Sequence, residues 1–340
     1  MTAGATTEEV LARLLTEGRR FASEYGDGLS NHRPMALLAL QRLGADAARL
    51  QAWAAAYESR LQPSPPPETW PTGDAWTGRL GDPAAFAAYR DLFAQWIAHE
   101  GATEALEQVL PGLMPGVGAA AFHGAIRVAA AARSGHPDEL ADALAYWACR
   151  CLPLGPLPAG DGPEPDPEAV LRRLRAGRSR RRLIVDRMAE AARDATLHAE
   201  LARLAIDGTQ AEALLQRLAR LAAKAYALSG NFTALHLVTG CHAMHVLLRF
   251  VHDRGAALRA FWQALGVAVA AAQLEPRPPV PPRPWPELVA AAIGHDDEHV
   301  IKLVEACREE ENAYGGDDWR AAATRVLTPL NHSHEEGSNP

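Results

Sequence analysis

The chain has 340 residues, which is enough for one large domain or two modest ones with an ample core. Hydrophobic residues make up 48% and charged residues 22%, the values of an ordinary globular protein. The formal net charge of −7 argues against broad nucleic-acid binding, which requires a basic face.

Alanine and leucine dominate the sequence, which favours helices from the first residues onward. Thr6 and Glu9 have the spacing of a capping box and predict the start of the first helix. The segment YGDGLSNHRPM interrupts it, and Ser30 or Asn31 is expected to cap the next helix. Further helices are predicted over residues 50–61, 83–99, 117–133 and 137–150.

Two proline-rich segments, 152–168 and 275–287, cannot continue helices or pair as central strands. The helical patterns around them cover residues 190–229, 232–251, 255–273, 286–292, 297–312 and 317–327. No segment shows the alternation of apolar and polar residues that is typical of a strand, so the predicted class is all-α. The proline-rich segments are domain linkers or surface loops. We favour loops on a single multi-helix, bundle-like domain over residues 1–330, followed by a disordered tail over 331–340.

The sequence carries no signal for export, a membrane span or a nucleotide site. Its N-terminus lacks a basic region followed by an apolar core, and no uninterrupted apolar stretch reaches membrane-spanning length. No G-x-G-x-x-G motif follows a strand, and there is no P-loop. The four cysteines are expected to be buried free thiols: Cys149, Cys151, Cys241 and Cys307. We therefore expect a cytoplasmic protein.

Histidine is the residue type that stands out, with 13 in the chain. Several lie among apolar or small residues: His32, His123, His236, His242, His245 and His299. Any one of them alone is most simply a core residue with a hydrogen-bond partner. Several together favour a metal ion, because each buried imidazole needs a partner and one ion satisfies several. Imidazole suits zinc, copper, iron and nickel.

Helical spacing limits which side chains can act together. His299 and Lys302, the latter one of only two lysines, stand about 60° apart on one helix face, and so do His242 and His245. His236 and His242 differ by about 120°, which makes a shared ion less natural in a regular helix. None of these spacings is a specific metal-binding motif.

Four blocks of the chain together resemble the questin oxidase-like family: LSNHRPMALLALQRLGA, MPGVGAAAFHGAIR, NFTALHLVTGCHA and GHDDEHVIKLVEA. They are spread over nearly the whole chain. The family includes fungal polyketide-tailoring enzymes that open anthraquinone-type rings by Baeyer–Villiger-like oxygen insertion or carbon–carbon cleavage. The resemblance implies a mononuclear non-haem Fe(II) site held by four histidines and a carboxylated lysine. The matching positions are His32, His123, His236, His299 and Lys302, with His242 as a rival ligand.

Lys302 suits that role chemically because a desolvated amine can lose its proton and react with CO₂, whereas arginine cannot be deprotonated in a protein. The resulting carbamate would be an anionic oxygen ligand beside His299, and these two residues are the expected catalytic pair. The alternative is a lysine that extends from an apolar face toward Glu298 or Glu305.

The expected activity is oxidative ring cleavage of an aromatic or quinone polyketide by O₂, without a tightly bound organic cofactor. An external reductant such as NADPH is left open. Asp296 or Asp297 is expected to cap a helix or to orient a ligand imidazole. Flat side chains are available for a substrate wall or for core packing: Tyr89, Trp96, Phe122, Trp147 and Phe232. The rival functions are a zinc hydrolase using the same histidines and a helical binding protein.

Overall fold

The computed structural model of the protein describes residues 5–66 and 75–328, and it confirms the all-α class. The described residues form sixteen α-helices: α1 (Thr7–Gly18), α2 (Arg33–Leu43), α3 (Ala47–Glu58), α4 (Phe86–Glu100), α5 (Ala102–Leu113), α6 (His123–Ser134), α7 (Pro137–Arg150), α8 (Pro167–Arg173), α9 (Ile184–Ala191), α10 (Ala195–Leu201), α11 (Ala211–Ser229), α12 (Phe232–Leu247), α13 (Arg254–Ala272), α14 (Trp285–Ile293), α15 (Glu298–Tyr314) and α16 (Asp318–Leu327). Short 3-10 turns occur at η1 (Trp76–Arg79), η2 (Pro83–Ala85), η3 (Met114–Gly116), η4 (Gly208–Gln210) and η5 (Leu248–Phe250). A small antiparallel hairpin that the sequence did not predict pairs β1 (Glu24–Tyr25) with β2 (Leu29–Ser30). The predicted tail, 331–340, lies outside the described residues.

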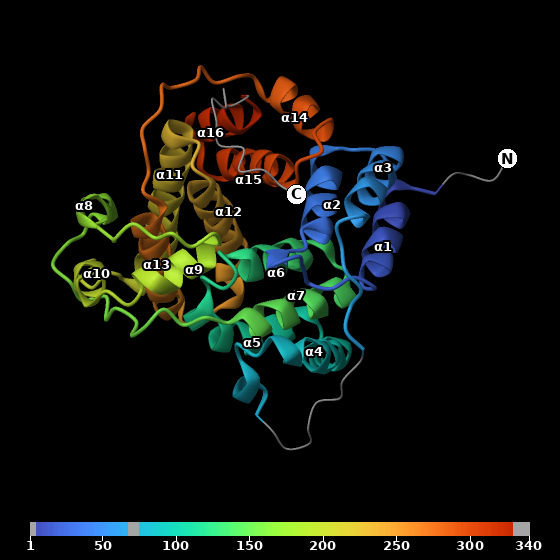
Figure 1. Cartoon of the computed structure of the whole chain (residues 1–340), viewed down its shortest axis with the longest axis horizontal. Helices are drawn as coiled ribbons and strands as arrows, with labels where there is room; N and C mark the ends of the chain where they lie inside the picture. The colour runs from blue at the N-terminus through green and yellow to red at the C-terminus, as the bar shows by residue number, and fades with distance from the viewer. Residues whose placement is uncertain (1–4, 67–74, 329–340) are drawn as a thin grey trace.

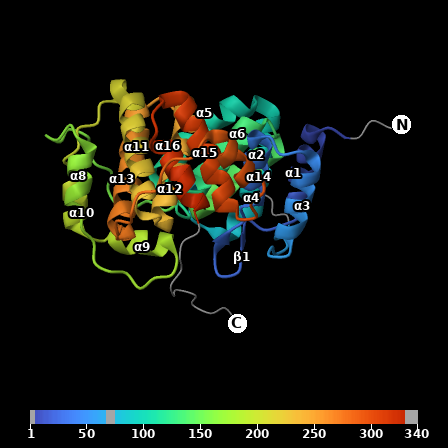
Figure 2. The ribbon, with the colours of Figure 1, turned by 90° about the horizontal axis from the view of Figure 1, so that it is seen from above.

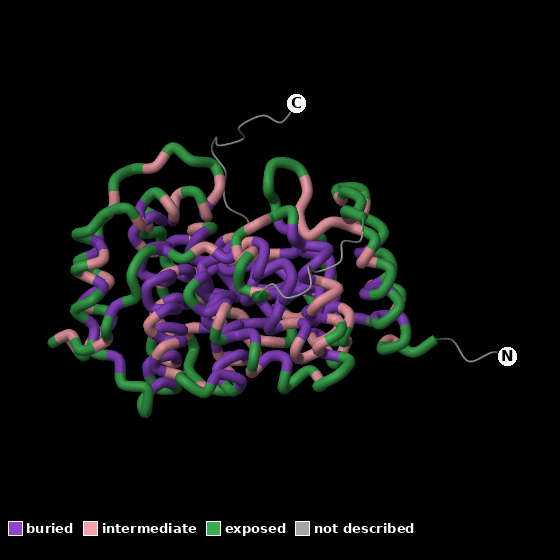
Figure 3. The backbone as a smooth tube through the Cα atoms, turned by 90° about the horizontal axis from the view of Figure 1, so that it is seen from below, coloured by how far each residue is buried: buried purple, intermediate pink, exposed green. Residues whose placement is uncertain are grey.

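Four helices form a closed ring of neighbours in the interior, because α2 packs on α6, α6 on α12, α12 on α15 and α15 on α2. Figure 1 shows α1–α3 at one end of the molecule and α8 and α10 at the other, and Figure 2 shows the same order from above. One contiguous buried cluster runs from Val10 to Ala323. In Figure 3 the buried backbone fills the middle of the molecule, and exposed backbone lies toward its ends and edges.

Helices whose N-termini are set by local capping residues begin at or near the positions predicted from the sequence. The backbone N–H of Glu9 donates to Thr6 Oγ1 (3.2 Å) and that of Thr6 to the Glu9 carboxylate (2.8 Å), which is the predicted capping box. Asp297 caps α15 by accepting from the His299 N–H at 2.7 Å. At α2 the N-cap position falls on His32, just after the predicted Ser30 or Asn31. Asn31 still accepts from the Arg33 N–H at 3.0 Å.

The largest difference from the sequence prediction lies before α6, which was expected to begin near residue 117. It begins at His123, because Ala120, Ala121 and Phe122 adopt left-handed φ values of 47°, 56° and 70°. Non-glycine residues rarely adopt this conformation, and it is strained. At Gly124 a Cβ atom would lie only 2.8 Å from Trp147 Cγ, so the glycine lets α6 approach α7 closely. This tight packing holds the strained turn that positions His123.

The single helical run predicted over residues 190–229 is divided into the end of α9, α10 and α11, and most of α9 lies before that run and was not predicted. Asp194 and Asp207 each accept a backbone N–H two residues ahead and start a new helix or turn. Helices α5 and α8 were not predicted at all. The two proline-rich segments are mostly exposed.

Helix α13 is the one described helix that is long and apolar enough to cross a membrane by those two criteria alone. Within the protein, 83% of its most apolar window is buried. Phe261 and Trp262 on this helix belong to the central core. Core packing therefore accounts for its apolar sequence.

Candidate metal centre

Four of the predicted ligands come together where helices of the interior ring begin. His32 is the N-cap residue of α2, His123 is the first residue of α6, and His299 is the second residue of α15. His236 is the fifth residue of α12. We call this group the histidine centre. Helix N-termini carry partial positive charge, so the centre favours anionic ligands.

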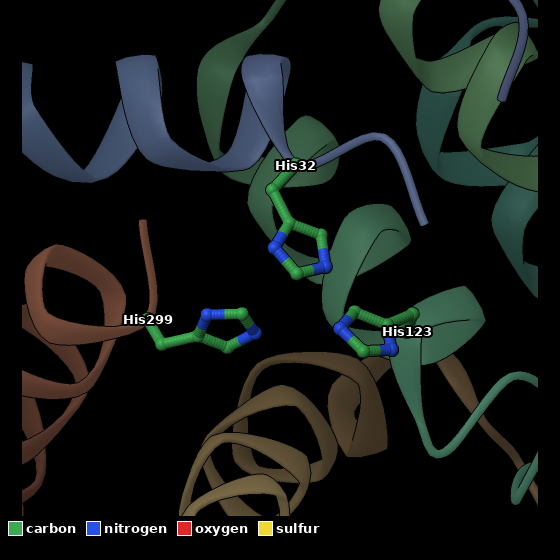
Figure 4. Close-up of side chains that lie close together, drawn as sticks. All are labelled: His32, His123 and His299. Carbon is green, nitrogen blue, oxygen red and sulfur yellow. The ribbon is translucent and has the colours of Figure 1, made fainter. Parts of the chain in front are cut away.

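Each of the four rings contacts two of the others. The ring centroids of His32 lie 4.6 Å from those of both His123 and His299. His236 lies 4.8 Å from His123 and 5.5 Å from His299. One ring nitrogen from each of His32, His123 and His299 lies within 4.8 Å of the others. Figure 4 shows these three rings pointing toward one another from three different helices.

Hydrogen bonds fix which nitrogen of three rings is available to a ligand. The Nδ1 atoms of His123 and His236 donate to the carbonyl oxygens of Ala120 (2.5 Å) and Phe232 (2.7 Å). A carbonyl only accepts, so Nδ1 carries the proton and Nε2 keeps its lone pair. The Nε2 atoms of His123 and His236 are buried and have no hydrogen-bond partner among the described residues. His299 Nδ1 lies 3.2 Å from Asp297 Oδ1, which fixes the third ring in the same way.

His32 has a different environment. Its Nδ1 atom is buried and lies 3.3 Å from Glu298 Oε1, but outside hydrogen-bonding geometry. Glu298 is itself buried and pairs with Arg60 at 3.4 Å. The sequence pattern named Glu298 only as a possible partner of Lys302, because His32 and Arg60 are more than 200 positions away.

The electrostatics of the centre favour neutral imidazoles. Burial lowers the pKa of His32, His123 and His236 well below the ordinary value of 6.5, and neighbouring positive charges lower it further. Burial also lowers the pKa of His299, although Asp297 opposes this shift. Neutral rings keep their lone pairs at neutral pH. Buried imidazole nitrogens without a partner, on rings that pack against one another, fit a metal ion, which satisfies several of them at once.

Lys302 lies one turn after His299 on α15 and is only 5% exposed. Its charge contributes to the lowered pKa of all four imidazoles, so its ammonium lies within electrostatic reach of the centre. Burial lowers the pKa of Lys302 to about 8, against the opposing effect of Glu298 and Asp297. It borders a small cavity of about 30 Å³ together with His242 and Glu305.

His242, the rival ligand, lies in a second cluster with His245 and Glu310, which we call the Glu310 cluster. The Nδ1 atoms of His242 and His245 donate to Glu310 Oε1 at 2.7 and 2.9 Å. Arg133 Nη1 donates to the remaining nitrogen of His242 at 3.0 Å. The described contacts therefore occupy both nitrogens of His242, unlike the rings of the histidine centre. The two histidines share one partner, as their 60° separation allows.

A cavity of about 600 Å³ adjoins the histidine centre, and all four histidines line it. Phe232 also lines the cavity and contacts His236 and His299, with ring centroids 4.7 and 4.8 Å away. Tyr25 of the unpredicted hairpin adds a second aromatic side chain. The volume is typical of pockets for drug-sized ligands.

The other aromatic candidates do not line this cavity. Tyr89, Phe122 and Trp147 are fully buried in the core, and Trp96 packs against it. Asp296 pairs with Arg49 on the surface. The four cysteines are buried free thiols, as expected.

Comparison with known proteins identifies the family of the chain. The family model described as Questin oxidase-like matches residues 29–307 of the chain, a range that includes the whole histidine centre and Lys302. The chain therefore belongs to the questin oxidase-like family. No curated protein matches it.

Proposed function

We propose that this member of the questin oxidase-like family is a mononuclear non-haem iron oxygenase that opens a ring of a polycyclic aromatic or quinone polyketide. Family membership indicates an oxidase that acts on a small molecule. The observation that carries the metal proposal is the convergence of buried imidazoles whose free nitrogens have no described protein partner.

Four imidazoles and one modified lysine would hold the iron: His32, His123, His236, His299 and Lys302. Imidazole nitrogen and an anionic oxygen are ligands that iron accepts together. The burial of Lys302 supports its carboxylation, because an amine with a pKa of about 8 is partly neutral at physiological pH. The nitrogen lone pair adds to CO₂, a C–N bond forms, and the amine proton leaves to solvent. Iron, when bound, supplies the capacity to react with O₂ that these side chains lack.

The remaining residues act on the substrate. Phe232 offers a flat face beside His236 and His299, against which an aromatic ring can stack. The converging N-termini of α2, α6 and α15 stabilise negative charge on a phenolate oxygen held near the centre. The 600 Å³ cavity gives the substrate room beside the histidine centre.

The principal test is metal analysis followed by an oxygenation assay. Protein purified without added metal should contain iron, and Fe(II)-loaded protein should incorporate ¹⁸O from ¹⁸O₂ into a hydroxyanthraquinone or its hydroquinone, assayed with and without NADPH. Stoichiometric zinc together with hydrolysis of the probe would instead support the hydrolase. Absence of any stoichiometric metal would support a helical binding protein.

The lysine has a test of its own, because the chain contains only two lysines. Incubation with ¹³C-bicarbonate should give a carbamate signal in the ¹³C NMR spectrum. That signal should vanish in Lys302→Arg and persist in Lys224→Arg, where the substituted lysine is exposed on α11. A signal that persists in Lys302→Arg would contradict carboxylation at this position.

A further inference from the structure

The lining of the large cavity contains positive charge besides the four histidines. Three arginines line the cavity: Arg150 at the end of α7, Arg182 just before α9, and Arg187 within α9. Arg150 donates to the carboxylate of Glu24, which lines the same cavity. Arg182 donates to the carbonyl oxygen of Asp27 at 3.1 Å and lies 3.7 Å from its carboxylate.

Arg187 differs from the other two arginines. Its side chain forms no hydrogen bond or ion pair with any residue in the described part of the chain, and its Nε atom is buried without a partner. A buried donor that lacks an acceptor costs stability, and more so when the donor is charged. The guanidinium presents donors in a planar fork that matches a carboxylate. An anionic group in the cavity would remove this cost.

The acidic residues of the cavity do not supply that group. Glu24 is held by Arg150, and Glu298 is held by Arg60 and lies beside His32. Asp186, the neighbour of Arg187 in sequence, is exposed in the first turn of α9, where the helix N-terminus favours a negative charge. Arg187 is thus a cavity-lining cation with no described counter-ion.

We propose that Arg187 binds a carboxylate substituent of the aromatic substrate, on the α9 wall of the cavity, while the reacting ring faces the histidine centre. The inference rests on the proposed function in one respect, because it takes the 600 Å³ cavity to be the substrate site. It adds a substrate class, acidic polycyclic aromatics, and a residue that determines specificity. Arg187 orients the substrate and takes no part in the chemistry.

Binding of two near-isosteric probes tests the inference without measuring turnover. Anthraquinone-2-carboxylate and anthraquinone-2-carboxamide are titrated into the wild-type protein by calorimetry, as isolated and after removal of metal with a chelator. The carboxylate should bind about 10- to 100-fold more tightly in both preparations, as expected for a hydrogen bond to a charged group. The preference should fall as ionic strength rises.

Three variants test which arginine causes the preference for the carboxylate probe over the carboxamide probe. Arg187→Gln should bring the two probes to within about threefold of each other, mainly by weakening binding of the acid. Arg187→Lys should retain part of the preference, since it keeps the charge but not the fork. Arg182→Gln, the matched control, removes a charge from the same cavity and should leave the preference unchanged. Iron content should be unaffected by all three.

Each contrary result is distinct. Equal binding of both probes, or equal losses in Arg187→Gln and Arg182→Gln, would overturn the role of Arg187 and leave the oxygenase proposal standing. A preference that disappears with the metal would assign the carboxylate to the histidine centre and also overturn it. A preserved preference in a protein without oxygenase activity would refute the proposed function alone. Failure of both probes to bind would count against both.

Discussion

The two histidine clusters of this protein lie on overlapping sets of helices but are built differently. In the histidine centre, backbone carbonyls or Asp297 hold Nδ1 of three rings, and the Nε2 atoms of two of them are buried without a partner. In the Glu310 cluster, a fully buried carboxylate accepts hydrogen bonds from two rings, and Arg133 contacts a third nitrogen. The first arrangement leaves lone pairs for a ligand. In the second, both nitrogens of His242 have protein partners, while Glu310 Oε2 is buried without one, and we expect the cluster to stabilise the fold.

The largest difference between the two clusters is expected when one histidine of each is replaced. His123→Ala should lower metal affinity by more than about 100-fold, because loss of a ligand exceeds the 10- to 100-fold effects typical of second-shell changes. His242→Ala should keep the wild-type metal content. Elemental analysis of purified protein, with circular dichroism to confirm folding, measures both. Loss of metal in His242→Ala with retention in His123→Ala would reverse the assignment.

The converse experiment removes the carboxylate of the second cluster. Glu310→Ala should reduce the free energy of unfolding by about 3–5 kcal/mol, the cost of breaking a buried charged pair. Metal content per folded molecule should stay the same. The matched control is Glu309→Ala, at a carboxylate that is 42% exposed and pairs with Arg133. Denaturant titration should show a loss of less than about 1 kcal/mol there. Equal losses would contradict a structural role for Glu310.

A smaller effect is expected from the group that orients His299. Asp297→Asn keeps a good helix cap but replaces the charged acceptor of His299 Nδ1 with a neutral one. Metal affinity should fall about tenfold, the lower end of the effect of second-shell substitutions. Asp296→Asn, at a side chain that is 82% exposed and paired with Arg49, should leave the affinity unchanged. Competition with a chelator of known affinity compares the two variants.

The smallest expected effect is a pH dependence confined to the Glu310 cluster. Burial alone would raise the pKa of Glu310, but the hydrogen bonds from His242 and His245 outweigh it and lower the pKa to about 2. Its contribution to stability is therefore complete above its ordinary value of 4.5 and is lost as the pH falls toward 2. Burial alone would lower the pKa of His242, but Glu310 and Glu305 raise it above 6.5. That contribution is complete below 6.5 and is lost as the pH rises through the raised pKa.

The stability difference between wild type and Glu310→Gln should consequently be largest between pH 4.5 and pH 6.5. It should shrink by about 1 kcal/mol on either side. Urea titrations across pH 3–8 measure it. A difference that does not vary with pH would show that shape, not charge, holds this cluster together.

Much of the local structure could be predicted from the sequence, because its causes are local. The capping box at Thr6 and Glu9 and the cap at Asp297 each involve residues within three positions. The start of α6 could not be predicted in this way. Nothing between residues 117 and 122 signals a left-handed turn, and the packing of Gly124 against Trp147 holds it in place. That turn sets the position of His123.

The histidines themselves could be selected from the sequence, because imidazoles on apolar faces need partners. Helical geometry also placed His236 and His242 on different faces of one helix, and the two lie in different clusters. Asp297, two positions before His299, was also a candidate from the sequence, but the distant acidic partners could not be found. Glu310 lies 68 positions after His242, and Glu298 lies far from His32 along the chain.

The sequence by itself determined the all-α class, the helix caps, the family and the short list of candidate ligands, since each depends on composition, near neighbours or a quoted block of residues. Tertiary structure decided which imidazoles lie together, which of their nitrogens have a hydrogen-bond partner, and which cavity-lining arginine side chain lacks a partner. The reason is that hydrogen-bond satisfaction depends on groups brought together from helices far apart in sequence. A residue's function in this protein depends on that partnership as much as on its own chemistry.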